Sequence, residues 1–182
     1  WFITHNQKPA IISRGYKAKK GHLSDEAAEL NMLLPSVPHF ANRQRIIAAQ
    51  NATEDGSNIL LLDDGFQHRK IDRDINLVTI DASDPFGCNR IFPRGLLREP
   101  LEGLQRADAI ILTRTDQVSI KARNEIQAEC SRLLGPHKKP WIQTEHRPTK
   151  LRLADGTTEP FQLLQNKRIL SVSAIGNPAA FQ

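Results

Sequence analysis

The sequence predicts an α/β fold with a doubly wound, mainly parallel sheet and flanking helices. Short apolar runs rich in β-branched residues recur along the 182 residues, and amphipathic stretches of helical character separate them. The runs are nearly continuous rather than alternating, which is typical of strands covered by helices on both faces. In such folds the active site lies at the carboxyl ends of the strands, so functional residues are expected directly after each run.

The expected strands are short. Their apolar runs occupy residues 10–12, 58–63, 75–81, 109–113, 141–144 and 168–173.

The expected helices lie between these runs, at residues 24–34, 42–52 and 119–134. The third carries Ile120, Ile126 and Leu133 among charged residues, which predicts one apolar face. Gly135-Pro136 ends it, because proline cannot continue a helix and glycine accepts the terminating conformation.

The expected domain organisation is a core at residues 1–148, a hairpin-like excursion at 149–165, and a last strand with the start of a further helix at 166–182. A polar Asp155-Gly156 turn between alternating segments predicts the hairpin. Residues 84–100 contain no clear element, and a connection of that length in a compact domain is usually functional or mobile.

Composition and charge restrict the function classes. Hydrophobic residues make up 39% and charged residues 25%, as in globular proteins, and no apolar run approaches the roughly 20 residues that cross a bilayer. The net charge of +5 suits an anionic partner, such as a nucleotide, a phosphorylated lipid, nucleic acid or a membrane surface. Aromatic residues at 5% and the lack of a recognition motif argue against nucleic acid. Two distant cysteines indicate neither a disulfide nor a zinc site.

The strongest local signal is the run at 60–62 that ends in Asp63-Asp64-Gly65, followed by Gln67 and His68. Acids at the end of such a strand bind or orient Mg²⁺ in nucleotide hydrolases and kinases, because this ion prefers hard oxygen ligands. The alternative interpretation is structural: Asp63 caps the turn, Asp64 is solvated and Gly65 supplies a positive φ.

Two further clusters follow the first run. The first is Arg14-Gly15, just after the apolar run at residues 10–12. Arg14 could bind a phosphate through two guanidinium nitrogens, or it could belong to a solvated basic loop. Asp25 opens the first expected helix after Ser24, where N-capping and the helix dipole are the structural explanation.

Two irregular segments complete the candidates. Residues 92–100 combine glycine, proline and arginine with Glu99, which suits a loop over phosphates or a nucleoside, or a long surface connection. Residues 113–116, Thr-Arg-Thr-Asp, are similar to the element by which GTPases hold guanine, although arginine stands where lysine is usual.

Five motifs in order resemble the tetraacyldisaccharide 4'-kinase family across nearly the whole chain. The departures are Ser24 and Ala27 beside Asp-Glu, Phe92 for leucine and Ala174 for glycine. The motifs lie at residues 13–16, 24–27, 63–68, 92–100 and 174–178.

The resemblance implies a P-loop NTPase-like fold and transfer of the γ-phosphate of ATP, with Mg²⁺, to the 4'-hydroxyl of tetraacyldisaccharide 1-phosphate, giving lipid IVA. It implies peripheral attachment to the cytoplasmic face of the inner membrane, no nucleic acid and a monomer. The phosphate-binding loop of the family is expected before residue 1 and a supporting histidine after residue 182, so the 182 residues alone are expected to show little kinase activity. A GTPase or metallochaperone of related fold stays the alternative.

The resemblance also implies residue roles. Asp25 matches the proposed catalytic base, and Asp64 is a second catalytic candidate. The remaining roles are Mg²⁺ binding by Asp63, Asp64 and Gln67, nucleotide binding by Arg98 and Glu99, with Glu99 at the nucleobase, and phosphate or substrate contacts by Arg14, Arg45 and His68.

Overall fold

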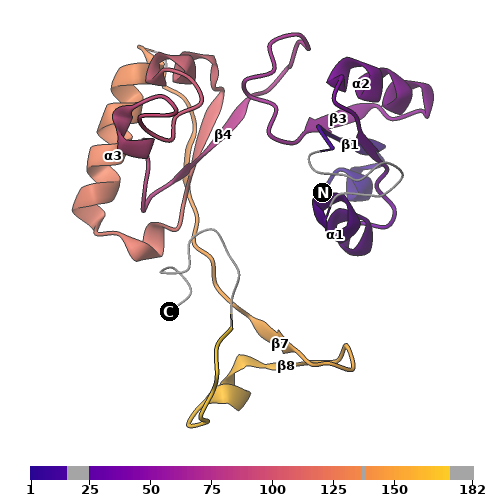
Figure 1. Cartoon of the computed structure of the whole chain (residues 1–182), viewed down its shortest axis with the longest axis vertical. Helices are drawn as coiled ribbons and strands as arrows, with labels where there is room; N and C mark the ends of the chain where they lie inside the picture. The colour runs from indigo at the N-terminus through magenta and orange to yellow at the C-terminus, as the bar shows by residue number, and fades with distance from the viewer. Residues whose placement is uncertain (16–24, 137, 173–182) are drawn as a thin grey trace. The chain divides into compact units, whose positions relative to one another are not determined.

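The computed structural model describes residues 1–15, 25–136 and 138–172, and its contacts divide the chain into two units (Figure 1). Unit 1 is Trp1–Asp74 and unit 2 is Ile75–Gln182. This division differs from the expected core at 1–148, whose boundaries stay a prediction.

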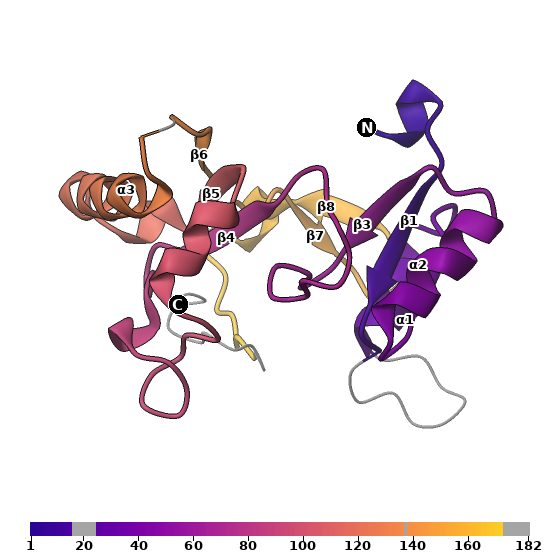
Figure 2. The ribbon, with the colours of Figure 1, turned by 90° about the horizontal axis from the view of Figure 1, so that it is seen from above.

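Unit 1 contains a three-stranded parallel sheet with the strand order β2-β1-β3. Helix α2 lies alongside β1 in Figures 1 and 2 and contacts both β1 and β2, while α1 contacts β2. The elements are η1 (Ile3–His5), β1 (Pro9–Ser13), α1 (Asp25–Leu33), β2 (His39–Ala41), α2 (Arg45–Glu54) and β3 (Ile59–Leu62).

The core of unit 1 forms between β1 and α2. All five residues of β1 are buried, as a central strand requires, and α2 covers it with small side chains that allow close approach. The buried cluster is Ala10, Ile12, Ala48 and Ala52, with Phe40, Leu60 and Leu62 packed against it.

Unit 2 contains a second parallel sheet, with the strand order β4-β5-β6, and a separate antiparallel hairpin of β7 and β8. Its elements are β4 (Leu77–Asp81), η2 (Gly87–Asn89), η3 (Leu101–Arg106), β5 (Ala109–Thr113), η4 (Thr115–Gln117), α3 (Ile120–Leu134), β6 (Trp141–Gln143), β7 (Lys150–Arg152), β8 (Thr158–Pro160) and η5 (Phe161–Leu164).

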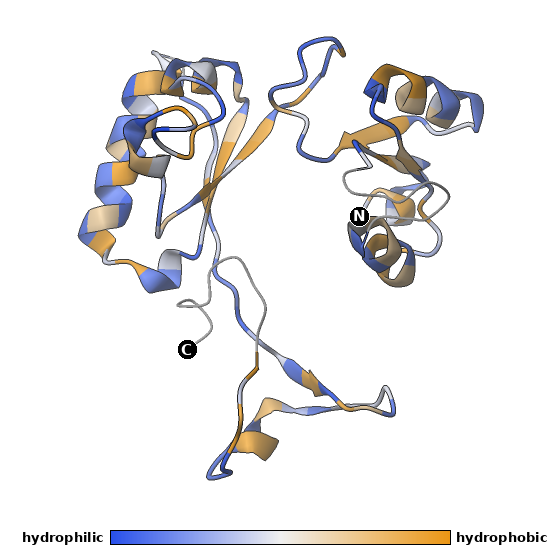
Figure 3. Cartoon of the chain, viewed as in Figure 1, coloured by the Kyte–Doolittle hydropathy of each residue, from blue (hydrophilic) through white to orange (hydrophobic). Residues whose placement is uncertain are grey.

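Helix α3 shows why its sequence forms a helix with one buried face. The Ser119 hydroxyl accepts a hydrogen bond from the Ala122 N–H at 3.2 Å, which caps the first turn, and Gly135 ends the helix with a φ of 82°. Ile126, Cys130 and Leu133 are buried at helical spacing, and Figure 3 shows hydrophobic and hydrophilic residues alternating along α3.

The expected α/β class with parallel sheets is confirmed, and five of the six expected strands are present within a few residues of their predicted ends. The strand expected at 168–173 is wrong over 168–172, since these residues form no strand, and Ser173 lies outside the described residues. Ile169, Leu170 and Val172 are 57%, 89% and 83% exposed, so the run has no sheet neighbour to bury it. Strand β2 was not predicted, because His39-Phe40-Ala41 is too short to form an apolar run. No helix in the described ranges is long and apolar enough to cross a membrane.

Candidate functional site

The acid turn, residues 63–68, begins where β3 ends. The Asp63 N–H donates to the Ile12 carbonyl at 2.9 Å, so sheet pairing continues one residue past the strand. Asp64 then adopts a φ of 49°, and Gly65 is buried so closely that a Cβ there would lie 2.7 Å from the Leu62 Cβ. The turn therefore requires glycine at 65, and it leaves both Asp63 and Asp64 exposed at the carboxyl end of the strand.

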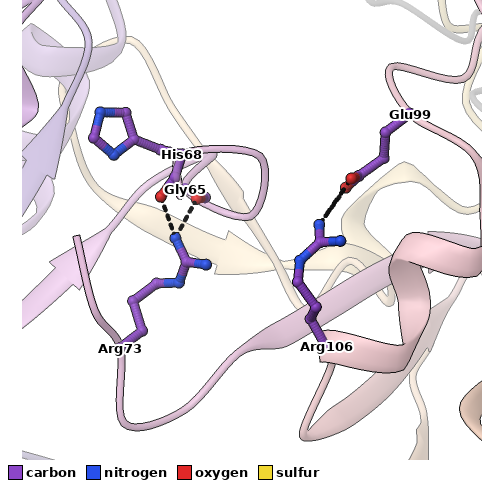
Figure 4. A network of polar contacts seen from close by, with 5 residues as sticks. All are labelled: Gly65, His68, Arg73, Glu99 and Arg106. Atoms are coloured by element: carbon purple, nitrogen blue, oxygen red, sulfur yellow. Dashed lines mark hydrogen bonds and ion pairs between the residues drawn. The ribbon is translucent and has the colours of Figure 1, made fainter. Parts of the chain in front are cut away.

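Two arginines hold the backbone of the acid turn. Arg45, at the start of α2 and only 6% exposed, donates from Nη2 to the Asp63 carbonyl at 2.8 Å and from Nη1 to the Asp64 carbonyl at 3.0 Å. Arg73 donates from Nη1 to the Gly65 carbonyl at 3.0 Å and to the His68 carbonyl (Figure 4). Charged donors form stronger hydrogen bonds than neutral ones, so this turn is fixed more firmly than an ordinary loop.

The other two polar members of the acid turn differ in burial. Gln67 is exposed and His68 is half-buried. The His68 N–H donates to the Gly65 carbonyl at 2.9 Å, while its Nδ1 is buried and has no hydrogen-bond partner within the described part of the chain. A buried ring nitrogen without a partner is costly, so it marks a position suited to a further polar group.

Arg14 lies at the same end of the sheet as the acid turn, where the carboxyl ends of the strands meet. The register pairs Ile12 with Leu62, so the residues that follow β1 and β3 emerge side by side. Arg14 is exposed there, and the preceding Ser13 hydroxyl lies 2.8 Å from His39 Nε2 on β2. An exposed cation, Arg14, and two exposed acids, Asp63 and Asp64, at the carboxyl ends of neighbouring strands suit a site that binds a metal ion and a phosphate.

Asp25 is the first residue of α1 and is exposed. The rest of the motif falls partly outside the description, because Ser24 and the side chain of Glu26 are not described. The last residue of the first motif, Tyr16, and the motif at 174–178 also lie outside the described residues.

In unit 2, the loop of residues 84–100 is closed by its own backbone. The N–H groups of Leu96 and Leu97 donate to the carbonyls of Gly87 and Arg90 at 3.0 and 3.1 Å, and Phe92 donates to Leu97 at 2.9 Å. The loop ends at the exposed Arg98 and the half-buried Glu99.

The Glu99 carboxylate is held in place. Both of its oxygens accept from Arg106 Nη2, at 2.7 and 2.8 Å, and the Glu99 side chain is 18% exposed (Figure 4). A Cβ on Gly103 would lie 2.8 Å from the Glu99 Cδ, so glycine at 103 makes room for the carboxylate. Next to this segment, Arg90, Arg94 and Leu101 line a cavity of about 390 Å³.

One residue of the segment at 113–116, Arg114, forms an ion pair with Asp81. Arg114 has a φ of 54° and its guanidinium binds the Asp81 carboxylate at the carboxyl end of β4. Burial raises the pKa of Asp81, but the hydroxyl and N–H of Ser83 and the charge of Arg114 outweigh it and hold the pKa below its usual value. Arg114 therefore has a structural partner in the segment that is similar to a guanine-binding element.

The model of the tetraacyldisaccharide-1-P 4'-kinase family matches residues 1–182. The chain belongs to this family. Among curated relatives with the name tetraacyldisaccharide 4'-kinase, that of Anaeromyxobacter sp. (strain Fw109-5) is 33% identical, over 97% of the chain and 52% of the relative. That of Syntrophus aciditrophicus is 34% identical over 96% of the chain and 53% of the relative, and that of Desulfatibacillum aliphaticivorans 42% identical over 76% and 40%. No solved structure matches.

The chain thus spans about half the length of the curated relatives it matches. Membership of the kinase family confirms the resemblance and disfavours the GTPase or metallochaperone alternative.

The residues of the acid turn fit Mg²⁺ by their chemistry. Within the described ranges no three histidine, cysteine, aspartate or glutamate side chains converge on a metal position. Mg²⁺ does not need such a cage, because it is usually bound by one or two carboxylates together with waters and substrate phosphates. The exposed pair Asp63 and Asp64 provides that donor set.

The structure brings together some predicted site residues and adds others. Arg14, Asp25, Arg45, Asp63, Asp64, Gln67 and His68 lie in unit 1, whereas Arg98 and Glu99 lie in unit 2. Sequence reasoning did not find the contacts of Arg73 with the acid turn, and it did not single out Arg106. The sequence signal for Arg73 was a cation close to the paired acids. Arg106, at the end of a short 3₁₀ helix, offered only its spacing of seven residues from Glu99.

Proposed function

We propose that the complete protein containing this chain transfers the γ-phosphate of ATP to the 4'-hydroxyl of tetraacyldisaccharide 1-phosphate, giving lipid IVA. The single observation that carries the proposal is the family match over all 182 residues. The acid turn at the carboxyl end of a parallel strand supports it, because phosphoryl transfer is chiefly positioning and electrostatic stabilisation around a metal-bound phosphate chain. We also propose the P-loop NTPase-like fold that this chemistry uses.

In this mechanism Asp25 accepts the proton of the attacking 4'-hydroxyl as its oxygen bonds to the γ-phosphorus, the bond from that phosphorus to the bridging oxygen of the β-phosphate breaks, and ADP leaves. Its exposed position at the start of α1 leaves the carboxylate accessible to a substrate. Asp63, Asp64 and Gln67 would hold Mg²⁺, which supplies charge neutralisation when bound to the phosphates. Arg14, which is exposed, and His68 would contact phosphate or substrate oxygens.

Arg98 and Glu99 would bind the nucleotide, with Glu99 at the nucleobase. Arg106 supports this role, because a carboxylate near a polyanionic nucleotide needs a counter-charge. Arg45 was expected to contact phosphate. Its Nη1 and Nη2 donate to carbonyls of the acid turn, so a phosphate contact by Arg45 stays a prediction, and bracing is the role that the observed bonds support.

The proposed partner is the anionic lipid substrate at the cytoplasmic face of the inner membrane, where the complete protein acts peripherally as a monomer. The net charge of +5 supports this location, because basic proteins are attracted to anionic lipid surfaces.

The test is a kinase assay of the complete gene product with ATP and tetraacyldisaccharide 1-phosphate, in which mass spectrometry locates the added phosphate. We expect a 4'-phosphorylated product, and a fall in kcat of about 100-fold or more for Asp25→Asn and Asp64→Asn. Asp55→Asn is the matched control, since Asp55 is an exposed acid of the same unit at the end of α2. A wild-type protein that leaves the lipid unphosphorylated, or an Asp25→Asn variant as fast as Asp55→Asn, would overturn the proposal.

A further inference from the structure

We infer that Arg73 is a positioning residue for the metal-binding acids, acting through the backbone of the acid turn. This inference rests on the proposed function, because it assigns Arg73 to the same site. Arg73 is half-buried, and its Nη1 donates to the Gly65 carbonyl at 3.0 Å and to the His68 carbonyl. One side chain from beyond the acid turn thus ties its middle to its end (Figure 4).

Arg73 completes a brace that Arg45 begins. Arg45 binds the carbonyls of Asp63 and Asp64 from α2, and Arg73 binds those of Gly65 and His68. Together the two guanidiniums hold four of the six carbonyls in residues 63–68. Both are charged donors, whose hydrogen bonds are roughly twice as strong as neutral ones.

The conformation of Asp64 explains why such a brace is needed. Its φ of 49° is in the left-handed region, which an L-residue with a side chain adopts at a cost, and such conformations persist only where the surroundings impose them. Arg45 holds the Asp64 carbonyl and Arg73 holds the next one. Without Arg73 the turn can relax at Gly65, and the carboxylates before it lose their fixed direction.

Fixed direction matters for the proposed ligand. Mg²⁺ demands near-ideal octahedral geometry, and groups that orient metal ligands typically account for about 10- to 100-fold in metal affinity or activity. If Arg73 acts this way, its loss raises the Mg²⁺ concentration required for activity. A purely structural arginine would lower stability and leave that concentration unchanged.

The experiment uses the complete protein with Arg73→Gln, Arg73→Lys and the control Lys70→Gln. Lys70 is an exposed cation three residues away, so its variant removes the same charge without the carbonyl bonds. We expect Arg73→Gln to raise the Mg²⁺ concentration for half-maximal activity about tenfold or more, with kcat largely restored at saturating Mg²⁺. Arg73→Lys should fall between Arg73→Gln and wild type, because a single ammonium can still donate to one or both carbonyls.

Hydrogen exchange in the absence of metal and nucleotide gives an independent readout. The His68 amide, which donates to the Gly65 carbonyl, should exchange faster in Arg73→Gln and at the wild-type rate in Lys70→Gln. If Arg73→Gln fails to fold, Arg73→Lys carries the same comparisons. Wild-type exchange of His68, or an unchanged Mg²⁺ requirement in a destabilised variant, overturns the inference. A wild-type protein without lipid kinase activity overturns the proposed function instead, and His68 exchange still decides the brace.

Discussion

Replacing Gly95 by alanine tests how tightly the loop of residues 84–100 is closed. A Cβ at this position would lie 2.2 Å from the Arg90 carbonyl oxygen and 2.6 Å from that of Gly87. These same oxygens accept the N–H groups of Leu97 and Leu96, at 3.1 and 3.0 Å. The methyl group can therefore enter only if both hydrogen bonds lengthen or break.

The expected cost follows from these contacts. Overpacking costs about 1–3 kcal/mol, and each backbone hydrogen bond contributes about 0.5–1.5 kcal/mol net. We expect Gly95→Ala to lower the free energy of local opening of the loop by about 2–4 kcal/mol. Since about 1.4 kcal/mol is tenfold, the amides of Leu96 and Leu97 should exchange about 30- to 1,000-fold faster.

Gly103→Ala is the matched control, because neither glycine has a positive φ. The nearest atoms to a Cβ on Gly103 are Glu99 Cδ and Oε2, both at 2.8 Å, which belong to the end of a flexible side chain and can retreat. This variant should disturb the Glu99 carboxylate and leave the exchange of Leu96 and Leu97 within about threefold of wild type. Equal exchange in Gly95→Ala and wild type would refute the steric reasoning.

Three further outcomes are expected. Folding lowers the pKa of Asp81, so the stability that its carboxylate contributes is complete above the ordinary pKa of 3.8 and is lost as the pH falls below it. The difference in unfolding free energy between wild type and Arg114→Gln should therefore shrink from pH 6 to pH 3. Urea titrations at each pH measure this difference. Burial and the nearby Glu129 charge raise the pKa of Cys130 to about 11, so a thiol reagent should label exposed Cys88 first and Cys130 only on unfolding. Ile110→Ala, in a fully buried position of β5, should lower the free energy of unfolding by about 2–5 kcal/mol in chemical denaturation.

Strand positions were predictable where burial and pairing coincide. The run at 109–113 is the central strand of its sheet, so its continuous apolar character matches its environment, and β5 has the predicted bounds. The run at 168–172 has similar composition but no partner, and an apolar pattern cannot specify the neighbour that a strand requires. For the opposite reason β2 was missed: three residues pair with β1 at Ile11, Ile12 and Ser13 without an apolar pattern of their own.

The candidate acids were predictable because chemistry and position coincide in the sequence. Asp63 and Asp64 follow an apolar run directly, so their place at a strand end could be inferred without coordinates. The contacts that hold these acids in place could not be predicted from the sequence. Arg73 binds carbonyl oxygens, which every residue has, so no sequence pattern indicates which ones it will bind. The contact between Arg106 and Glu99 was also not predicted. It depends on the short 3₁₀ helix at Leu101–Arg106, which brings Arg106 next to Glu99.

The two kinds of acceptor have different electrostatic consequences. In unit 2, Arg106 and Arg114 bind the carboxylates of Glu99 and Asp81, so each pair is close to neutral. In unit 1, Arg45 and Arg73 bind carbonyls, which are dipoles and cancel no charge at that bond. The positive charge of Arg45 therefore stays close to the acid turn and offsets the repulsion between adjacent carboxylates and an approaching polyphosphate. Loss of Arg73 thus removes a charge as well as two hydrogen bonds, and comparison with Lys70→Gln, which removes charge alone, separates the two contributions.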